Sequence, residues 1–148
     1  MSSTGFNYYH RVAFHETDNM GVVHHSNYIK YFEEARVAWL RERDLMRMHI
    51  PKGPYVFAVI EADCRYLRPG RFDDELITRV EGIVKGMRLT FRYATWSSDR
   101  KEWLATGTTI LVPLTATELR PARLPEAIKE KFANAPFSSA WPPSPPED

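Results

Sequence analysis

Cysteine is nearly absent from this sequence, and its scarcity limits the class of protein. The 148 residues contain a single cysteine, Cys64. One cysteine cannot form an internal disulfide, so the chain is not a small disulfide-stabilised secreted domain, and a reducing compartment suits it better. The first residues are polar and lack the basic-then-apolar plan of a signal peptide. We therefore expect a cytoplasmic protein.

Long apolar runs and excess charge are missing as well. No run approaches the roughly 18 apolar residues of a membrane-spanning helix, so no membrane span is expected. The formal net charge is only +1, which gives no indication of a nucleic-acid partner. No P-loop, GxGxxG pattern or internal repeat is present. What remains is an ordinary globular composition in a chain long enough for one domain.

One long helix is expected over residues 28–45. Apolar side chains recur there at helical spacing and fall on one face; they are Tyr28, Phe32, Ala35 and Trp39. Ser26 or Asn27 is expected to cap its first turn, because a short side-chain oxygen can accept a hydrogen bond from an unpaired N–H.

Five segments alternate apolar and polar residues in the manner of strands. They cover residues 7–14, 55–66, 74–85, 88–97 and 103–114, with turn-forming residues between the last four. Two of the expected faces are Val56, Ala58, Ile60, Ala62 and Cys64 in the second strand, and Leu104, Ile110 and Val112 in the last. Consecutive alternating strands favour an antiparallel sheet, and with the long helix they predict an α+β domain.

The chain is expected to divide into a single domain, residues 1–133, and a tail, residues 134–148. A short helix is predicted over residues 125–133, with Pro125 near its first position. The tail is rich in proline and is predicted to be flexible. Packing of Phe137 and Trp141 is the less favoured alternative, because chain ends are usually loose.

Residues 14–28 hold most of the candidate chemistry. Asp18, Asn19 and Gly21 are turn formers between the first strand and the helix. The amino end of a helix presents unpaired N–H groups and a partial positive charge, which suit an oxyanion. Taken alone, Asp18 is better explained as a turn residue.

The sequence of this stretch resembles a known family. Residues 17–28 read TDNMGVVHHSNY and residues 31–36 read YFEEAR, similar to the D-x-x-G-V-V-x-H-x-x-Y and Y-x-E-x-A-R patterns of the 4-hydroxybenzoyl-CoA thioesterase-like branch of the hotdog-fold acyl-CoA thioesterases. The thioesterases associated with the Tol-Pal system belong to that branch. The resemblance extends over residues 6–132 and implies a curved sheet wrapped around the helix, paired as a homodimer or assembled as a homotetramer.

The resemblance also implies roles for individual residues. Asp18 matches the family's catalytic carboxylate, as general base or nucleophile. His25 is expected to contribute its backbone N–H to the oxyanion site, with its ring as a further candidate for orienting the water or the thioester. Other substrate-binding candidates are Val23, Asn27, Tyr28, Lys85 and Arg88, with Arg68 and Arg71 as additional cations for the phosphates of coenzyme A. His24 is expected to be structural or exposed.

The sequence thus predicts an acyl-CoA thioesterase without metal or other cofactor, since His10, His15, Glu16, His24 and His25 show no regular ligand spacing. Acyl-carrier-protein thioesters are an alternative substrate. A dehydratase would need a different arrangement of histidine and acid. The remaining candidate functions are a non-catalytic acyl-thioester binding module and a structural partner of an envelope or lipid-synthesis complex. The aromatic residues Tyr8, Tyr9, Phe57, Tyr66 and Trp96 are expected in the core or at an interface.

Overall fold

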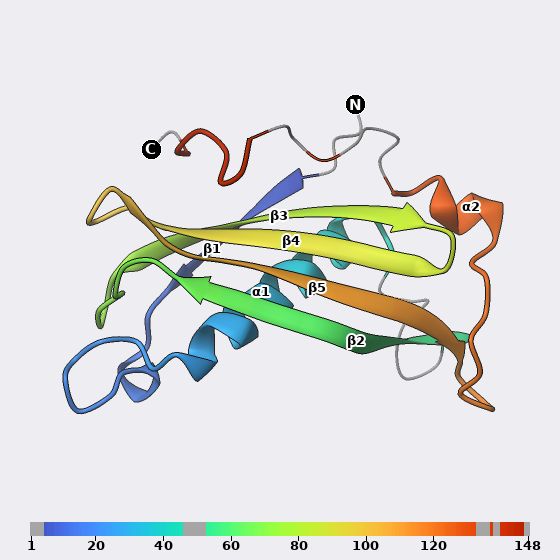
Figure 1. Cartoon of the computed structure of the whole chain (residues 1–148), viewed down its shortest axis with the longest axis horizontal. Helices are drawn as coiled ribbons and strands as arrows, with labels where there is room; N and C mark the ends of the chain where they lie inside the picture. Colours follow the sequence, from blue (N-terminus) through green and yellow to red (C-terminus); the bar gives the residue numbers. More distant parts are fainter. Residues whose placement is uncertain (1–4, 46–52, 133–136, 138–139, 147–148) are drawn as a thin grey trace.

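The structure is a computed structural model that describes residues 5–45, 53–132, 137 and 140–146. Five antiparallel strands form one sheet in the order β1-β3-β4-β5-β2, and the long helix lies against one face (Figure 1). The elements are β1 (Gly5–Arg11), η1 (Phe14–Glu16), α1 (Ser26–Glu42), β2 (Tyr55–Tyr66), β3 (Glu75–Lys85), β4 (Arg88–Ser97), β5 (Glu102–Thr115) and α2 (Glu126–Lys129). The predicted α+β class, with one curved antiparallel sheet and one main helix, is confirmed.

Helix α1 begins and ends earlier than the predicted range of 28–45. The prediction that Ser26 or Asn27 caps it is wrong, because the N-cap residue is His25 and it makes no side-chain cap. The Ser26 N–H donates instead to Nδ1 of His24, 3.2 Å away. The Asn27 side chain donates to the backbone oxygen of Glu16 at 2.7 Å. The first turn is therefore joined to the segment before it rather than capped by its own residues.

The inner face of the sheet is packed tightly against α1. The Phe32 ring stacks on Tyr93, with ring centroids 4.6 Å apart. Gly107 of β5 permits this approach, because a Cβ there would lie 2.5 Å from a Phe32 ring carbon. Farther along α1, Trp39 packs on Phe91 of β4 and on Phe132, which follows α2. The expected apolar helix face is thus the one that the sheet buries.

Two strand faces differ from the prediction, and both differences come from β-bulges. In β2 the register shifts between Val59 and Glu61, so the expected face of Val56, Ala58, Ile60, Ala62 and Cys64 is divided between the two sides. A second irregularity falls where Thr95 and Trp96 of β4 meet β5. Leu104 is buried as expected, but Ile110 pairs with Thr90 on the outer face, whereas Leu111 pairs with Leu89 inside.

The ends of four other elements, β1, β3, β5 and α2, also differ from the expected ranges. Strand β1 stops at Arg11, and Phe14 lies in the turn η1 rather than in a strand. Helix α2 is shorter than residues 125–133, and Pro125 is its N-cap residue; Ala133 lies outside the described residues. No helix in the described part of the chain is both long and apolar enough to cross a membrane.

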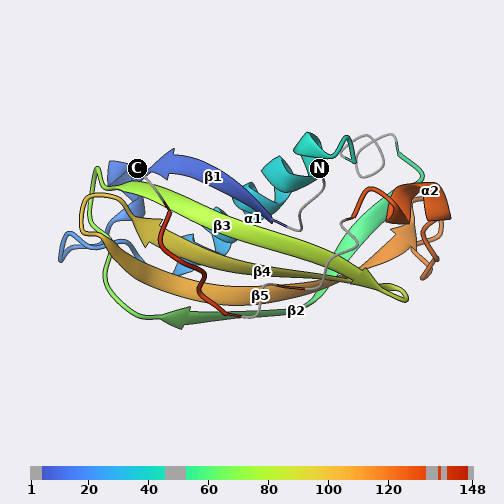
Figure 2. The same ribbon diagram turned by 90° about the horizontal axis from the view of Figure 1, so that it is seen from above.

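The C-terminal segment crosses the outer face of the sheet, opposite α1 (Figure 2). Phe137 and Trp141 lie on the guanidinium of Arg92, 4.4 and 4.1 Å from their ring centroids. The Trp141 Nε1–H donates to the backbone oxygen of Tyr93 at 3.2 Å. The less favoured alternative, local packing of these two aromatic residues, is therefore what the structure has. The division at residue 133 and the flexibility of the tail stay predictions.

Candidate active site

Asp18 lies in a short hairpin between η1 and α1. The hairpin is closed by an antiparallel bridge between Thr17 and Val23. Next to that bridge, the Asp18 N–H donates to the backbone oxygen of Val22 at 2.8 Å. Gly21 makes the turn with φ of +79°, a conformation that glycine adopts without steric cost. The tight turn fixes the position of Asp18 one residue beyond the closing bridge.

One of the two oxygens of the Asp18 carboxylate is hydrogen-bonded within its own hairpin. Its Oδ1 accepts the N–H groups of Met20 at 2.8 Å and Val22 at 3.3 Å. Its Oδ2 has no hydrogen-bond or ion-pair partner within residues 5–45, 53–132, 137 and 140–146. The contacts of Oδ1 are those of a turn aspartate, and Oδ2 leaves one carboxylate oxygen available for chemistry.

The start of α1 offers a backbone hydrogen-bond donor, the His25 N–H, two residues past the bridge. The N–H of Asn27 donates to the backbone oxygen of His24, and that of Tyr28 to the oxygen of His25. The N–H of His25 itself has no partner among the described residues. An open N–H at a helix amino end, supported by the helix dipole, can stabilise a developing negative charge on oxygen.

A cavity of about 280 Å³ opens beside this donor. It is lined by Val23, His25, Tyr28, Tyr66, Leu67, Arg68 and Pro69. The Tyr66 hydroxyl donates to the backbone oxygen of His25 at 3.1 Å, and the Tyr28 hydroxyl accepts from the Gly70 N–H at 3.2 Å. Burial raises the pKa of Tyr28 to about 12, so this phenol stays protonated at neutral pH. With both hydroxyls engaged, the rings present mainly apolar surface.

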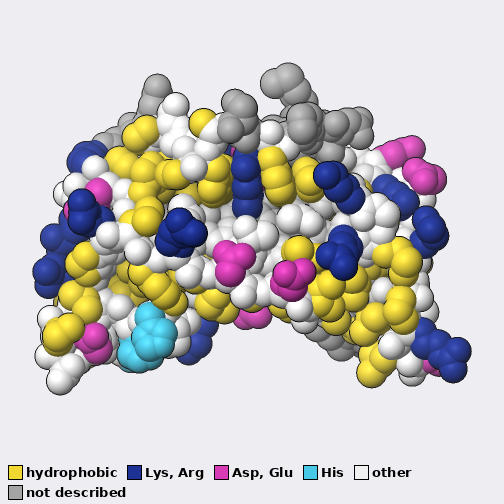
Figure 3. All heavy atoms as spheres, in the orientation of Figure 1, with side chains coloured by type: hydrophobic (Ala, Val, Ile, Leu, Met, Phe, Trp, Pro, Cys, Tyr) yellow, Lys and Arg dark blue, Asp and Glu magenta, His cyan; other side chains and the backbone are white. Residues whose placement is uncertain are grey.

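The histidines next to this cavity are exposed on the surface. Figure 3 shows histidine side chains gathered at the end of the molecule where α1 begins, beside hydrophobic surface. His24 and His25 are both exposed, and their rings lie 4.2 Å apart between centroids. The expectation that His24 is structural or exposed fits its contact with Ser26 at the helix start.

The predicted site residues are only partly brought together. Val23, His25 and Tyr28 line the cavity, and Arg68 joins them at its rim. Asn27 is buried and holds the turn η1 rather than lining the cavity.

Two other predicted residues lie away from the site. Lys85 and Arg88 flank the β3–β4 turn, at the opposite end of the sheet from the start of α1. Arg88 lies 3.8 Å from the Glu61 carboxylate of β2. Within one chain, these two cations do not adjoin His25.

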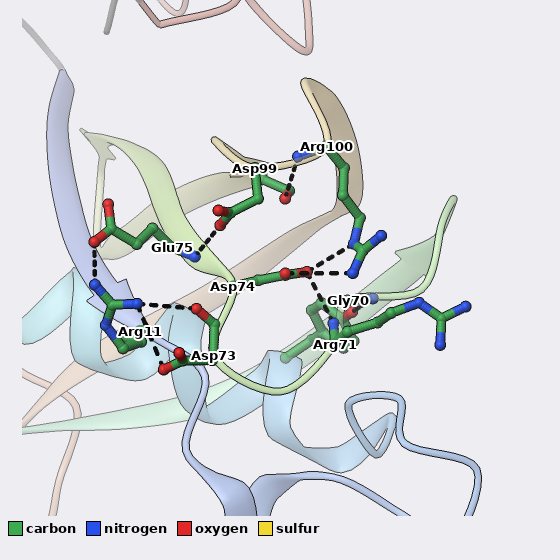
Figure 4. A network of polar contacts seen from close by, with 10 residues as sticks. Arg11, Gly70, Arg71, Asp73, Asp74, Glu75, Asp99 and Arg100 are labelled. Carbon is green, nitrogen blue, oxygen red and sulfur yellow. Dashed lines mark hydrogen bonds and ion pairs between the residues drawn. The ribbon is translucent and has the colours of Figure 1, made fainter.

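Charged residues fasten the loop that forms one wall of the cavity. Figure 4 shows Asp74 accepting from Arg100 and from the Arg71 N–H, at 2.9 and 3.0 Å. Nearby, Arg11 contacts Asp73 and Glu75. The loop between β2 and β3 is thereby held so that the Gly70 oxygen accepts from the Val23 N–H at 2.8 Å.

A larger cavity, about 650 Å³, lies nearby between β1, β3 and the β4–β5 turn. Its lining includes Arg11, Glu75, Asp99 and Lys101. Charges of both signs at its surface suit an apolar acyl group less well than the smaller cavity does. We therefore place the candidate site at the smaller cavity beside His25.

Sequence reasoning misses Leu67 and Pro69 of the cavity lining, and also the roles of Tyr66 and Gly70. It groups Tyr66 with core and interface aromatics, yet this residue is about half exposed and contacts His25. It treats Gly70 only as a turn former, yet a Cβ there would lie 3.1–3.2 Å from Leu104, Tyr28 and Val23. Neither role has a local sequence signal, because both contacts join β2 or its following loop to α1. Among the described residues, no three His, Cys, Asp or Glu side chains could hold a metal ion.

Comparison with known proteins agrees with this architecture. The chain matches the Thioesterase-like superfamily over residues 12–132. It is 36% identical over 96 residues to a putative esterase of Aquifex aeolicus, covering 64% of this chain and 74% of that protein. It is 27% identical over 133 residues to the acyl-CoA thioester hydrolase YbgC of Escherichia coli O6:H1, covering 89% and 98%.

A solved structure supports the fold independently. The crystal structure of Slr0204, a 1,4-dihydroxy-2-naphthoyl-CoA thioesterase from Synechocystis, superposes with a TM-score of 0.78 at 22% identity, covering 86% of this chain and 95% of that one. This likeness confirms the hotdog arrangement of sheet and helix. Since the family match extends over most of the sequence, the chain belongs to the Thioesterase-like superfamily.

Proposed function

We propose that this protein hydrolyses acyl-CoA thioesters to the free acid and coenzyme A, with Asp18 and the His25 N–H as the reacting pair. The observation that carries the proposal is the His25 N–H beside an apolar cavity, one short hairpin away from the Asp18 carboxylate. Within the described part of the chain, this N–H and one oxygen of that carboxylate have no partner. Membership of the Thioesterase-like superfamily and the activity for which the YbgC relative is named support it.

The chemistry needs few groups. The Asp18 carboxylate either takes a proton from a water that attacks the thioester carbonyl or attacks it directly, giving an anhydride that water then cleaves. In both routes the carbonyl oxygen becomes negative and is stabilised by the His25 N–H. The thiol leaving group needs no strong acid, because its pKa is far below that of an alcohol.

The site is expected to be completed by a second copy of the chain. Strand β2 is an edge strand with exposed apolar side chains at Val59 and Ile60, and the cavity lies beside its end at Tyr66. Antiparallel pairing of two β2 edges would cover this strand. It would also bring the β3–β4 turn of the second copy, with Lys85 and Arg88, to the end of the sheet where His25 lies. These cations would then be able to meet coenzyme A phosphates.

Replacement of Asp18 by Asn tests the proposal. An Asn side-chain oxygen can still accept from Met20 and Val22, so the hairpin is retained while the charge is removed. We expect kcat for thiol release from a panel of short, long and aromatic acyl-CoAs to fall by about 100-fold or more. The matched control is Asp99→Asn, because Asp99 also accepts a backbone N–H but lies in the β4–β5 turn, outside the Asp18 hairpin. Equal activity of Asp18→Asn and wild type would falsify the assignment.

An acyl-thioester binding module is the second candidate, favoured by the two turn contacts of Asp18 Oδ1. Binding of acyl-CoA by the wild type without release of thiol would establish it instead. Acyl-carrier-protein thioesters belong in the same substrate panel. The Tol-Pal branch and a cytoplasmic location stay predictions.

A further inference from the structure

A partly buried polar link connects the Asp18 hairpin to the inner side of α1. The Glu16 Oε1 accepts the Tyr31 hydroxyl at 2.9 Å and the Ala13 N–H at 2.8 Å. Tyr31 is 1% exposed and lies one turn beyond the start of α1. The carboxylate therefore joins the segment before the hairpin to the helix after it.

The backbone of Glu16 makes a second connection to the same helix. Its carbonyl oxygen accepts the His24 N–H at 2.9 Å and the Asn27 side-chain N–H at 2.7 Å. Glu16 is thus bonded to residues on both sides of His25. With the adjacent bridge of Thr17 to Val23, it closes the base of the hairpin that carries Asp18.

The Tyr31 hydroxyl is held firmly as a donor. Burial and the neighbouring Glu16 raise the pKa of Tyr31, so it stays protonated. The His10 ring packs 4.5 Å from the Tyr31 ring, and its Nε2 contacts the Thr78 hydroxyl at 3.2 Å. Thr78 in turn contacts Thr95 at 2.9 Å. The phenol is therefore supported by β1, β3 and β4, and not by the hairpin alone.

We propose that Glu16 and Tyr31 are positioning residues, which fix the Asp18 hairpin against the start of α1 so that the carboxylate and the His25 N–H face one thioester. The inference deepens the proposed function and rests on it. Neither residue lines the cavity beside His25. Their loss should therefore change the reaction step more than the binding of substrate, because a small displacement of a catalytic group is costly to rate.

Tyr31→Phe is the principal test, because it removes one hydroxyl and keeps the ring. We expect kcat to fall by about tenfold with KM within about twofold of wild type. Tyr8→Phe is the matched control: its hydroxyl also donates to a glutamate, Glu34, at 3.0 Å, but on the exposed side of α1. That variant should keep both constants.

Variants of Glu16 distinguish the hydrogen-bonding role of its side chain from the effect of its negative charge. In Glu16→Gln the side-chain oxygen can still accept from Tyr31 and Ala13, so kcat should stay within about threefold of wild type. Glu16→Ala should lose at least as much as Tyr31→Phe, because it also removes the acceptor of the Ala13 N–H. The double variant should lose little more than Glu16→Ala, because both changes break the link between Glu16 and Tyr31. A tenfold loss in Glu16→Gln, an additive double variant or an unchanged Tyr31→Phe would each overturn the inference.

Amide hydrogen exchange provides a readout that does not need turnover. The Asp18 and His24 N–H groups are bonded within the hairpin and to Glu16, and both should exchange about tenfold faster or more in Tyr31→Phe but not in Tyr8→Phe. Equal protection in the two variants contradicts the inference even if turnover is absent. Absence of thiol release from the wild type contradicts the proposed function, whereas turnover that Tyr31→Phe does not alter contradicts only the positioning role.

Discussion

The two faces of the sheet are both covered, but by different kinds of contact. The inner face lies under α1 and is packed with aromatic and aliphatic side chains such as Phe32, Trp39 and Phe91. The outer face carries Glu81, which is 1% exposed and lies 2.9 Å from Arg92. Arg92 is covered by Phe137 and Trp141. The inner face is therefore packed by apolar side chains, whereas on the outer face an ion pair lies beneath two aromatic rings.

The difference has energetic consequences. Burial of apolar area is the dominant stabilising contribution to folding. A buried ion pair contributes little net stability, because removing both charges from water offsets much of their attraction. Substitutions on the inner face should therefore cost more stability than substitutions on the outer face. The inner face also carries His10, so its contribution to stability should depend more strongly on pH.

The largest loss of stability is expected from Phe32→Ala. Phe32 is fully buried and stacks on Tyr93, so truncation leaves a cavity against β5. We expect the free energy of unfolding to fall by about 3–5 kcal/mol in urea titrations. Phe14→Ala is the control, because Phe14 is 74% exposed, and its cost should be under about 1 kcal/mol. Equal losses in the two variants would contradict the prediction that a buried aromatic side chain contributes more stability than an exposed one.

The next largest effect is a dependence of stability on pH through His10. The ring is faced by Tyr8, Thr78, Tyr31 and Glu16, and burial lowers its pKa to about 4, a shift that Glu16 partly opposes. The unfolded chain takes up this proton near pH 6.5 and the folded chain does not. Stability is therefore full above about pH 6.5 and falls towards about pH 4, by about 3 kcal/mol from this residue.

Unfolding titrations from about pH 7 to about pH 4 measure this contribution. His10→Gln should flatten the decline over that range by about the same amount, while His15→Gln, at an exposed position of η1, should leave the curve unchanged. An identical curve for His10→Gln and wild type would show that the buried ring does not control this range.

The smallest effect is expected on the outer face, from Trp141→Ala. This change removes the indole hydrogen bond to Tyr93 and one ring from Arg92. We expect a loss of about 1–2 kcal/mol in the free energy of unfolding. A double-mutant cycle with Arg92→Met measures the ring–cation contribution directly. A coupling energy near zero, or a loss as large as that of Phe32→Ala, would contradict the contrast between the two faces.

Much of the secondary structure can be predicted from periodicity. The ranges 55–66 and 88–97 coincide with β2 and β4, because turn-forming residues such as Pro54, Gly86 and Ser98 lie close to their ends. The faces are harder to predict, since a bulge inserts one residue and reverses the alternation beyond it. The misplaced Ile110 and the divided face of β2 both follow from such irregularities. No turn residue marks either bulge in the sequence.

In the candidate site, residues of one sequence motif can be predicted, whereas contacts between distant segments cannot. Asp18 and His25 stand in one short motif, so their type and spacing are visible directly. Glu16, Tyr66 and Gly70 act through partners on other elements. Lys85 and Arg88 are suggested as phosphate-binding residues only because they are cations. Within one chain they lie far from His25, because they flank the β3–β4 turn at the other end of the long strands.

The sequence by itself determined the elements, the helix face that is buried, the turn at Gly21 and the residue types available for thioester chemistry, because each depends on neighbours within a few positions. Only the tertiary structure decided which hydroxyls are engaged, how the hairpin is fastened to α1 and what covers Glu81. Those outcomes depend on sheet register and on side chains that approach from distant segments, which no local pattern encodes.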